Sequence, residues 1–565
     1  MKEILGNIVA KQLKDFKEDE IIELIEVPTM KELGDFSLPC FTLAKRLKVA
    51  PIKIAEELKV SILEEQNSNV ISEMNVVNGY LNFFINKEIY INKIINSAIS
   101  SDYGLNDYGR GKVICIDYSS PNIAKNFHVG HLRTTIIGNS LYKIYKRLGY
   151  QVVRINHLGD WGTQFGKLIL AYKNWSSKEQ VEEKGIEELL RIYMLYNIKA
   201  KSTPELNDEA RAWFVKMENG DEEALSIWEW FKDISMIEFQ KIYHMLGMEF
   251  DSYAGESFYM DKVPALVEML KEKNLLEESQ GAYIIKLDEY NMPPCLITKK
   301  DGSSIYHSRD IAAVLYRKEE YGFDKCLYVT GMEQKLHFAQ VFKAIELMEY
   351  EWSKDLVHVP YGLVSLEGAK LSTRNGNIVY AQDILNEAIE RAAHLIEVKN
   401  PSLTEKESVA KMVGIGAVIF HDLYNQRIKN TSFSWQDVMN FDSATGPYAQ
   451  YTYARAKSIL RKVGGVTNDA NVNVKLLTED ASFHLIKMIA LYSEKILEAA
   501  KRYEPSIVAR YIISLSTAFN RFYQECNIMN AKKDIQEARL VLVDLTQQII
   551  KDAMGLLGIS CPEVM

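Results

Sequence analysis

Two histidines three residues apart, His128 and His131, are the side chains in this sequence best suited to chemistry. They flank Gly130 and stand where helical spacing begins. A helix N-terminus carries roughly half a positive charge and several unpaired N–H groups, so it attracts phosphate. Imidazole can donate hydrogen bonds to phosphate oxygens, and glycine lets a flat ring approach the backbone. The pattern favours a nucleotide site, and its simpler alternative is two polar residues that cap a helix.

The elements around the histidines predict a parallel sheet. A buried strand, a helix and a second strand with its loop follow one another at 112–119, 130–149 and 151–162. This order is typical of a βαβ unit. Apolar strands return at 326–331 and 356–366, after a helical and charged insertion. We expect a Rossmann-like α/β domain, and the absence of G-x-G-x-x-G argues against a hydride-transfer cofactor.

The flanking segments differ from this central part. Residues 74–86 are rich in β-formers around an Asn78–Gly79 turn signal, and glycine, aspartate and asparagine cluster at 101–112. From about 441, apolar residues recur at helical spacing. We therefore predict an α/β multidomain chain of three domains: a small α+β domain (1–105), a catalytic domain with helical insertions (106–440) and an all-α bundle (441–565).

Bulk composition is that of a globular protein, with 47% hydrophobic and 25% charged residues in 565. No run reaches the roughly 20 apolar residues of a membrane span, and the charged N-terminus lacks a signal peptide, so we expect a cytoplasmic protein without a membrane partner. The six cysteines are scattered and predict neither a zinc site nor disulfides. The net charge of −9 argues only weakly against a nucleic-acid partner, because the location of basic residues matters more than their sum.

Several stretches resemble one family. SSPNIAKNFHVGHLRTTIIGNSL (119–141) resembles the "HIGH" region of class I aminoacyl-tRNA synthetases, specifically the arginyl-tRNA synthetases. Four further stretches are similar to that family in the same order along nearly the whole chain: GDFSLPCFTLAK (34–45), NHLGDWGTQFG (156–166), GAKLSTRNGN (368–377) and TGPYAQYTYARAKSI (445–459).

The resemblance implies an arginine–tRNA ligase. Such an enzyme joins L-arginine to ATP as arginyl-adenylate with release of pyrophosphate, then transfers the arginyl group to tRNA(Arg) and releases AMP. It implies ATP with Mg2+ on the phosphates and no resident metal, and we expect a monomer. The implied ATP-binding residues are His128, Gly130, His131, His337, Gln340, Lys370, Ser372 and Arg374.

The second signature of the family departs from the common KMSKS form. Alignment of KLSTR puts Thr373 where a second lysine normally contacts the phosphates. We predict that Lys125 supplies the missing cation, with Arg374 as the alternative; otherwise Lys125 is an ordinary surface lysine. The catalytic set implied by the resemblance is therefore His128, His131, Lys125 and Lys370.

Recognition of arginine requires a carboxylate, because guanidinium is planar, permanently charged and bidentate. Tyr306 and Asp310 are four residues apart and could face one side of a helix. The resemblance assigns both to the guanidinium; without it, Asp310 would pair with a neighbour such as Arg309 or cap a turn. The full set implied for arginine is Asp117, Ser120, Pro121, Asn122, His131, Tyr306, Asp310 and Gln334.

The family also implies two regions of contact with tRNA. Asn78, Tyr80 and Asn82 match a patch on its N-terminal domain that touches the tRNA elbow. Tyr448 and the terminal Met565 match positions that contact the anticodon, although aromatics at helical spacing are usually core.

Three alternatives remain open. A class I synthetase for cysteine would call for a zinc site, and one for glutamate would call for a cationic pocket at Asp310. Some small nucleotidyltransferases carry H-x-G-H but lack a C-terminal bundle. A catalytically idle RNA-binding relative would not need both histidines and Lys125.

Overall fold

The computed structural model describes residues 1–28, 30–64, 69–100, 102–105, 107–300, 303–366, 369–370, 380–465 and 472–565. The chain forms two compact units. The smaller comprises Met1–Tyr103, Ile459–Leu491 and Thr517–Thr546, and the larger comprises Gly104–Ser458, Tyr492–Ser516 and Gln547–Met565. The three-domain division at 105/106 and 440/441 stays a prediction.

The smaller unit contains a three-stranded antiparallel sheet in the order β1-β3-β2. Asn78 and Gly79, between β2 and β3, have φ angles of 50° and 82°. A two-residue hairpin turn of type I′ needs positive φ at both positions, so the predicted turn is confirmed. The elements of this part are α1 (Lys2–Ala10), α2 (Glu18–Leu24), β1 (Phe36–Pro39), α3 (Phe41–Leu47), α4 (Pro51–Glu64), β2 (Ile71–Val77), β3 (Tyr80–Ile85) and α5 (Lys87–Ala98).

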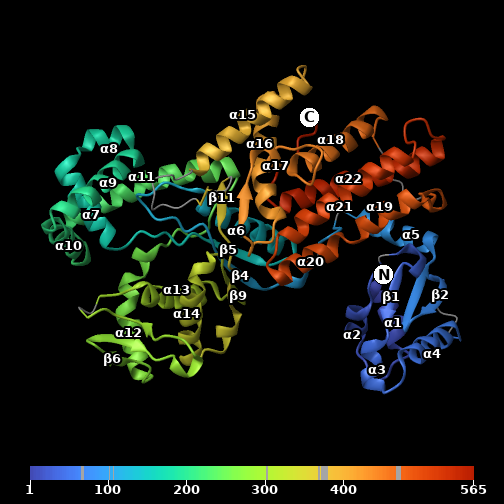
Figure 1. Cartoon of the computed structure of the whole chain (residues 1–565), viewed down its shortest axis with the longest axis horizontal. Coiled ribbons are helices and arrows are strands. Elements are labelled where there is room, and N and C mark those ends of the chain that lie inside the picture. Colours follow the sequence, from blue (N-terminus) through green and yellow to red (C-terminus); the bar gives the residue numbers. More distant parts are fainter. Residues whose placement is uncertain are drawn as a thin grey trace. The chain divides into compact units, whose positions relative to one another are not determined.

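The larger unit is built on a parallel sheet in the order β10-β9-β4-β5 (Figure 1). Cys115 and Cys326 stand opposite each other on neighbouring strands and are fully buried with Ile311 and Val341 of the covering helices. The Rossmann-like sheet is thereby confirmed. Its elements are β4 (Val113–Asp117), α6 (Val129–Arg147), β5 (Gln151–Ile155), α13 (Tyr306–Tyr321), β9 (Lys325–Tyr328), α14 (Lys335–Leu347) and β10 (Leu356–His358).

The apolar run 356–366 does not form one strand of that sheet. Only β10 joins it, whereas β11 (Val364–Leu366) forms a separate sheet with β12 (Ala369–Lys370) and β13 (Thr431–Phe433). Pro360 lies between the two strands and has no N–H to donate, which explains the break.

The predicted helical insertion follows β5. Figure 1 shows helices α7 to α10 extending away from the sheet, at the left of the view. The inserted elements are α7 (Thr163–Trp175), α8 (Lys178–Lys184), α9 (Ile186–Ser202), α10 (Glu205–Glu218), α11 (Glu222–Leu246), α12 (Val263–Glu272) and a small antiparallel sheet of β6 (Glu277–Ser279), β7 (Ala282–Ile285) and β8 (Cys295–Leu296).

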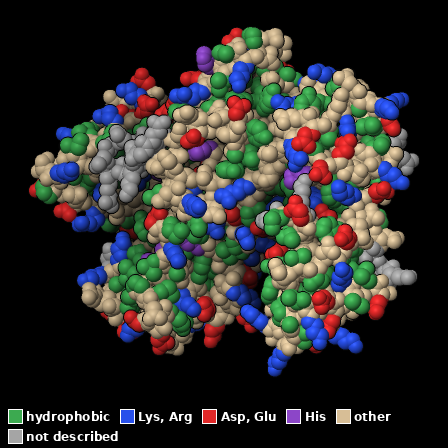
Figure 2. Space-filling view, turned by 45° about the vertical axis from the view of Figure 1, so that its right-hand side comes forward, with side chains coloured by type: hydrophobic (Ala, Val, Ile, Leu, Met, Phe, Trp, Pro, Cys, Tyr) green, Lys and Arg blue, Asp and Glu red, His purple; other side chains and the backbone are tan. Residues whose placement is uncertain are grey.

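From about residue 441 the described residues form helices, as the spacing predicts, and further helices precede them. No helix in the part of the chain that the structure describes is long and apolar enough to cross a bilayer. Basic and acidic side chains are interspersed on the face shown in Figure 2. The helices are α15 (Ala381–Lys399), α16 (Lys406–Tyr424), α17 (Trp435–Val438), α18 (Gly446–Lys462), α19 (Asp480–Ala490), α20 (Tyr492–Arg502), α21 (Ser506–Glu525) and α22 (Lys533–Leu556).

Candidate active site

The loop from β4 to α6 has an unusual backbone. Ser119, Ser120 and Ala124 have φ angles of 74°, 45° and 56°. Non-glycine residues hold such angles only where their surroundings fix them, and these sites are often functional. Here the backbone N–H of Ser120 donates to Oδ1 of Asn156 at 3.1 Å, which ties this loop to the one that follows β5. Both loops therefore meet at the carboxyl edge of the sheet, where ligands bind in such folds.

The two histidines lie stacked at the start of α6. Their ring centroids are 3.8 Å apart at an interplanar angle of 21°. Nδ1 of His128 accepts the N–H of Gly130 at 3.0 Å, and Nδ1 of His131 accepts the N–H of His128 at 3.4 Å. A Cβ at Gly130 would lie 2.9 Å from Cε1 of His128, so glycine makes room for the ring. The helix-capping alternative is therefore correct for Nδ1 of both residues.

The capping leaves Nε2 of each histidine available. Burial lowers the pKa of His128, and the charge of Lys125 lowers it further. Burial, His128 and Lys125 hold the pKa of His131 well below its ordinary value. Both rings are neutral at pH 7, and since Nδ1 accepts, each must carry its proton on Nε2. The pair thus presents two Nε2–H donors, which suit phosphate oxygens.

These donors border a cavity of about 290 Å3 at the carboxyl edge of the sheet. Six predicted site residues line it together: Ser120, Asn122, His128, Gly130, His131 and Gln334. Its wall also contains the backbone of the loops after β9 and β10 and the side chains of Glu333 and Tyr361. Pro121 is buried in the same loop as Ser120 but does not line the cavity.

Lys125 is exposed and stands close enough to the histidines to lower the pKa of both. Although the residue as a whole is exposed, protein atoms partly desolvate its ammonium and lower its pKa. No ion pair within 4 Å involves Lys125 among the described residues, so its charge is not neutralised by a carboxylate there. This position fits a cation held beside a phosphate site.

Asp117 ends β4 and is not among the residues that line the cavity. Its carboxylate pairs with the buried guanidinium of Arg317 at 2.8 Å and accepts a hydrogen bond from Ser120 at 3.0 Å. The ionic partner of Asp117 is therefore Arg317 and not the substrate cavity. Asp117 positions Ser120 and does not line the cavity.

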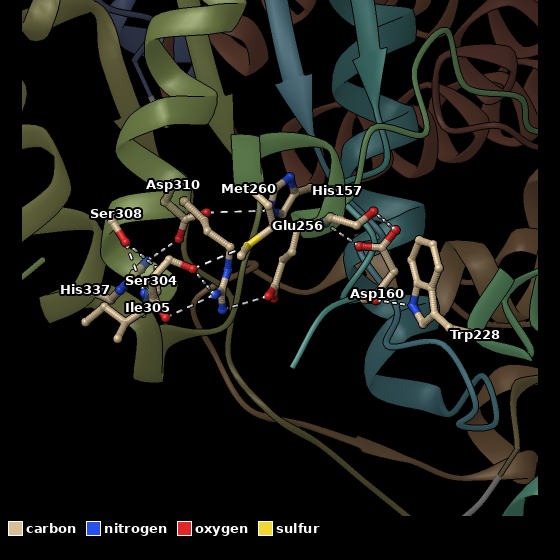
Figure 3. Close-up of polar contacts among 12 residues, drawn as sticks. His157, Asp160, Trp228, Glu256, Met260, Ser304, Ile305, Ser308, Asp310 and His337 are labelled. Atoms are coloured by element: carbon tan, nitrogen blue, oxygen red, sulfur yellow. Dashed lines mark hydrogen bonds and ion pairs between the residues drawn. The ribbon is translucent and has the colours of Figure 1, made fainter. Parts of the chain in front are cut away.

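Asp310, on the first turns of α13, lies in a second polar cluster (Figure 3). Nε2 of His337 is 2.5 Å from its Oδ2, and Nε2 of His157 is 3.6 Å from its Oδ1. Burial opposes ionisation, but His337, His157 and Arg317 outweigh it and lower the pKa of Asp310. The carboxylate is therefore charged, and the alternative pairing with Arg309 is wrong.

Arg309 pairs with Glu256 at 3.0 Å, and its guanidinium lies 5.0 Å from the centre of the Tyr306 ring. Burial raises the pKa of Glu256 to about 8, against the attraction of Arg309 and with the repulsion of Asp310 and Asp160. Tyr306 is 57% exposed. Glu256 thus adds a second carboxyl group near Asp310 that the sequence did not single out.

Asp160 fixes the turn that carries Glu256. Its carboxylate accepts hydrogen bonds from the N–H and Oγ of Ser257 at 2.8 and 2.7 Å, and from Lys232 at 2.8 Å. Its carbonyl accepts from the indole of Trp228, as Figure 3 shows. The loop after β5 and the inserted helix α11 therefore hold the Glu256 turn together.

The remaining residues that were predicted to bind ATP are less accessible. His337 is engaged with Asp310, and Gln340 is buried, where its amide N–H groups donate to the carbonyls of Pro293 and Pro294. Only the backbone of Lys370 is described, in β12, and Ser372 and Arg374 lie outside the described residues.

Arg133, two residues beyond His131, connects α6 to the sheet that carries β12. Its guanidinium donates to Oγ1 of Thr431 at 2.6 Å and to the carbonyls of Leu363, Arg427 and Lys429. The sequence analysis did not single out Arg133, because no spacing signal reports partners some 300 residues away.

The predicted tRNA residues occupy different environments. Asn78 is exposed at the hairpin turn and Tyr80 is partly exposed, but Asn82 is 2% exposed and accepts a hydrogen bond from Ser37 at 2.6 Å. Asn82 therefore supports the strand pair. In the larger unit, Met565 lines a cavity of about 430 Å3, and Tyr448 is partly exposed.

The aromatic and cationic side chains of this second cavity are arranged in pairs. The guanidinium of Arg455 lies 4.8 Å from the centre of the Tyr451 ring, and the ammonium of Lys399 lies 4.7 Å from that of Phe441. Rings and cations of this kind can hold an unstacked RNA base.

Comparison with known families gives three matches that together span most of the chain. Residues 94–435 match the model of "tRNA synthetases class I (R), catalytic domain", residues 449–565 the "DALR anticodon binding domain", and residues 3–85 the "Arginyl tRNA synthetase N terminal domain".

Individual relatives agree along the full length. The chain is 49% identical to arginine–tRNA ligases of Alkaliphilus metalliredigens and Clostridioides difficile, over 100% of its own length and 99% of theirs. Its fold matches the crystal structure of Plasmodium falciparum arginyl-tRNA synthetase with a TM-score of 0.82 at 25% identity, covering 100% of this chain and 98% of that one. The Thermus thermophilus enzyme has the same TM-score at 23% identity, with full coverage of both chains.

Proposed function

Because the chain belongs to the arginyl-tRNA synthetases, a class I family, we propose that it works as an arginine–tRNA ligase through the two polar sites described above. It activates L-arginine with ATP and transfers the arginyl group to tRNA(Arg). The observation that carries the proposal is the pair of neutral histidines whose Nε2–H groups border the cavity at the carboxyl edge of the sheet.

The first step needs positioning and charge stabilisation more than a protein nucleophile. The arginine carboxylate attacks the α-phosphorus of ATP, and negative charge builds on the phosphoryl oxygens as pyrophosphate leaves. Nε2–H of His128 and His131 donates to those oxygens, and Gly130 lets the nucleotide approach. Lys125 supplies the cation, and Lys370, Ser372 and Arg374 of the second signature also bind the ATP. Mg2+ accompanies the triphosphate.

Arginine occupies the space between the cavity and the Asp310 cluster. Ser120, Asn122 and Gln334 hold its amino and carboxyl groups, with Pro121 and Asp117 fixing the loop. Asp310 accepts the guanidinium, and Tyr306 covers it. His337 and Gln340 support this wall from α14 rather than contact the phosphates, because their polar atoms already meet protein groups.

A carboxylate built for guanidinium discriminates well against lysine. An ammonium offers a single point charge in place of a planar fork, so one carboxylate oxygen and its neighbours would remain unpaired. Glu256 adds to this preference, since a second carboxyl can share the guanidinium that Asp310 binds.

For the transfer step, tRNA must contact both the N-terminal and the C-terminal parts of the protein. Met565, Tyr448 and the neighbouring aromatic and cationic pairs hold an anticodon base, whereas Asn78 and Tyr80 contact the elbow and Asn82 supports them. The protein acts as a monomer in the cytoplasm.

The experiment is ATP–pyrophosphate exchange with tRNA(Arg) present, run with each amino acid on the wild type and on Asp310→Asn. Arginine alone should support exchange in the wild type, and the variant should raise the KM for arginine at least about 100-fold, as expected for loss of a charge-assisted pair. Glu268→Gln, an exposed carboxylate on α12, serves as the control. Exchange with lysine or glutamate but not arginine would refute the assignment.

A further inference from the structure

The ring of His157, in the loop after β5, bridges two side chains of α13. Its Nδ1 is 3.2 Å from a guanidinium nitrogen of Arg317, and its Nε2 is 3.6 Å from Oδ1 of Asp310. Asp310 and Arg317 are seven residues apart, so they share one face of that helix about two turns apart. Figure 3 shows the ring beside the Asp310 carboxylate. One imidazole therefore connects a buried cation to the carboxylate of the second polar cluster.

The contact with Arg317 fixes which nitrogen of His157 carries the proton. A guanidinium can only donate hydrogen bonds, so Nδ1 must accept, and the neutral ring holds its proton on Nε2. Burial lowers the pKa of His157, and the charge of Arg317 lowers it further, against the attraction of three nearby carboxylates. The ring is therefore neutral at pH 7 and directs an N–H donor at Asp310.

The support behind His157 is itself fixed. The side chain of Arg317 is 1% exposed, and its guanidinium pairs with Asp117 at 2.8 Å. Asp117 in turn accepts the hydroxyl of Ser120 at 3.0 Å. A fully buried side chain in close packing has little freedom to change its rotamer, so the guanidinium holds Nδ1 of His157 in place. A chain of polar contacts thereby extends from the Ser120 loop to Asp310.

The Nε2–H group of His157 has no hydrogen-bond partner among the described residues. A buried donor without a partner is costly, so such groups call for an explanation in the use of the site. At 3.6 Å from Oδ1 of Asp310, this donor is just beyond hydrogen-bond distance, and contacts of this length in active sites often shorten when the substrate binds.

The Asp310 carboxylate has room for this additional bond. Its Oδ2 already meets Nε2 of His337 at 2.5 Å. An ionised carboxylate offers about four acceptor positions, so it can accept from both histidines and still receive two N–H groups of a guanidinium. Donors on both oxygens would fix the plane of the carboxylate, which a bidentate contact requires.

We propose that His157 is a positioning residue, whose Nε2–H holds the Asp310 carboxylate in the plane that receives the guanidinium of arginine. The inference rests on the proposed function for the identity of the substrate. The simpler role for His157 is structural: its ring centroid is 5.5 Å from that of Tyr259, and its Nδ1 serves Arg317. That role needs no donor on the side of Asp310, so the two can be separated.

The first test is ATP–pyrophosphate exchange by the full-length protein with tRNA(Arg) present. In His157→Asn, Oδ1 can replace Nδ1 as the acceptor for Arg317, but no donor reaches Asp310. The KM for arginine should rise about tenfold or more, as for loss of one hydrogen bond to a charged group, with the KM for ATP within about twofold of wild type. In His157→Gln, the longer amide can donate to Asp310, so this variant should recover most of the affinity for arginine.

The second test is a double-mutant cycle, which shows whether His157 acts through Asp310. In the Asp310→Asn background, the further change His157→Asn should alter kcat/KM for arginine by no more than about twofold, because the carboxylate that His157 positions is already absent. Independent roles would instead give the product of the two single losses.

A matched control is His244→Asn, which changes an exposed histidine on α11 and should leave the KM for arginine unchanged. Urea denaturation of each variant reports folding separately from substrate binding. An unaltered KM for arginine in folded His157→Asn, an equal rise in the KM for ATP, or independent losses in the cycle would overturn the proposal. Failure of the proposed function is seen separately, because the wild type would then not support exchange with arginine.

Discussion

Nε of Arg133 lies 3.6 Å from Oδ1 of Asp422, and the side chains of both residues are largely buried. Arg133 follows the histidine pair on α6 and lines the cavity, and Asp422 is on α16, so the pair connects the cavity wall to α16. The hydrogen bonds of Arg133 to Thr431 and to three carbonyls complete this connection.

Removal of the cation should destabilise the fold more than removal of the anion. Arg133→Met leaves a buried carboxyl group and three carbonyls without their donor, which costs about 3–5 kcal/mol for a broken buried pair. Burial raises the pKa of Asp422, so the charge of its carboxylate is costly to hold, and Asp422→Asn, which keeps the shape and removes the charge, should cost only about 1 kcal/mol. Urea denaturation of both variants measures the two changes in the free energy of unfolding. Equal decreases in the two variants would show that the guanidinium is not the centre of this network.

His128→Asn should separate capping from catalysis. Asparagine is a good N-cap and its Oδ1 can take the place of Nδ1, but it lacks the Nε2–H donor. We expect wild-type stability and a fall of about 100-fold or more in the rate of ATP–pyrophosphate exchange, as for loss of one transition-state donor. His128→Ala should lose the same rate and about 1 kcal/mol of stability in addition. Normal exchange in the asparagine variant would remove Nε2 of His128 from the reaction.

Lys125 should supply the cation that the second signature lacks. Lys125→Ala should reduce exchange far more than it changes the unfolding transition, because its side chain is exposed and forms no ion pair among the described residues. Lys125→Arg should recover part of the rate by restoring the charge. The same measurement on Arg374→Ala identifies the alternative donor, and an unaltered rate in Lys125→Ala combined with a loss in Arg374→Ala would reverse the assignment.

Stability should fall as the pH is lowered from about 6.5 to 4, in part through His358. Burial lowers the pKa of His358 to about 4, and the charges of Arg427, His337 and Lys335 contribute. The pKa of His358 is lower in the folded protein than in the unfolded chain, so the unfolded state binds the proton at a higher pH. Protonation between about pH 6.5 and 4 therefore lowers the free energy of unfolding. His358→Gln keeps a polar group near Oγ1 of Thr330, the present partner at 2.9 Å, and should reduce the loss of stability between pH 7 and 4.5 by about 2 kcal/mol. Denaturation at pH 7, 5.5 and 4.5 measures it, and a parallel profile would exclude His358.

Local signals predicted the elements that position the site. The strand, the helix that begins beside Gly130, and the Asn78–Gly79 turn all depend on neighbours in sequence, so their periodicity and turn chemistry suffice. The stacked histidines follow from their spacing of three on one helical turn.

Contacts between residues far apart in the sequence could not be predicted from these local signals. The pairing of Asp310 with His337 and of Asp117 with Arg317 joins elements that only the folded sheet brings together. The same holds for Asn82, whose alternation in β3 places it against Ser37 inside the smaller unit. The separate sheet of β11 depends on β13, about 65 residues further along the chain.

The most direct test is a crystal structure with ATP and L-arginine bound together. The account predicts phosphate oxygens within hydrogen-bond distance of Nε2 of His128 and His131, and the guanidinium within about 4 Å of the Asp310 carboxylate. Density for the triphosphate away from the histidine pair, or for the guanidinium away from Asp310, would contradict it.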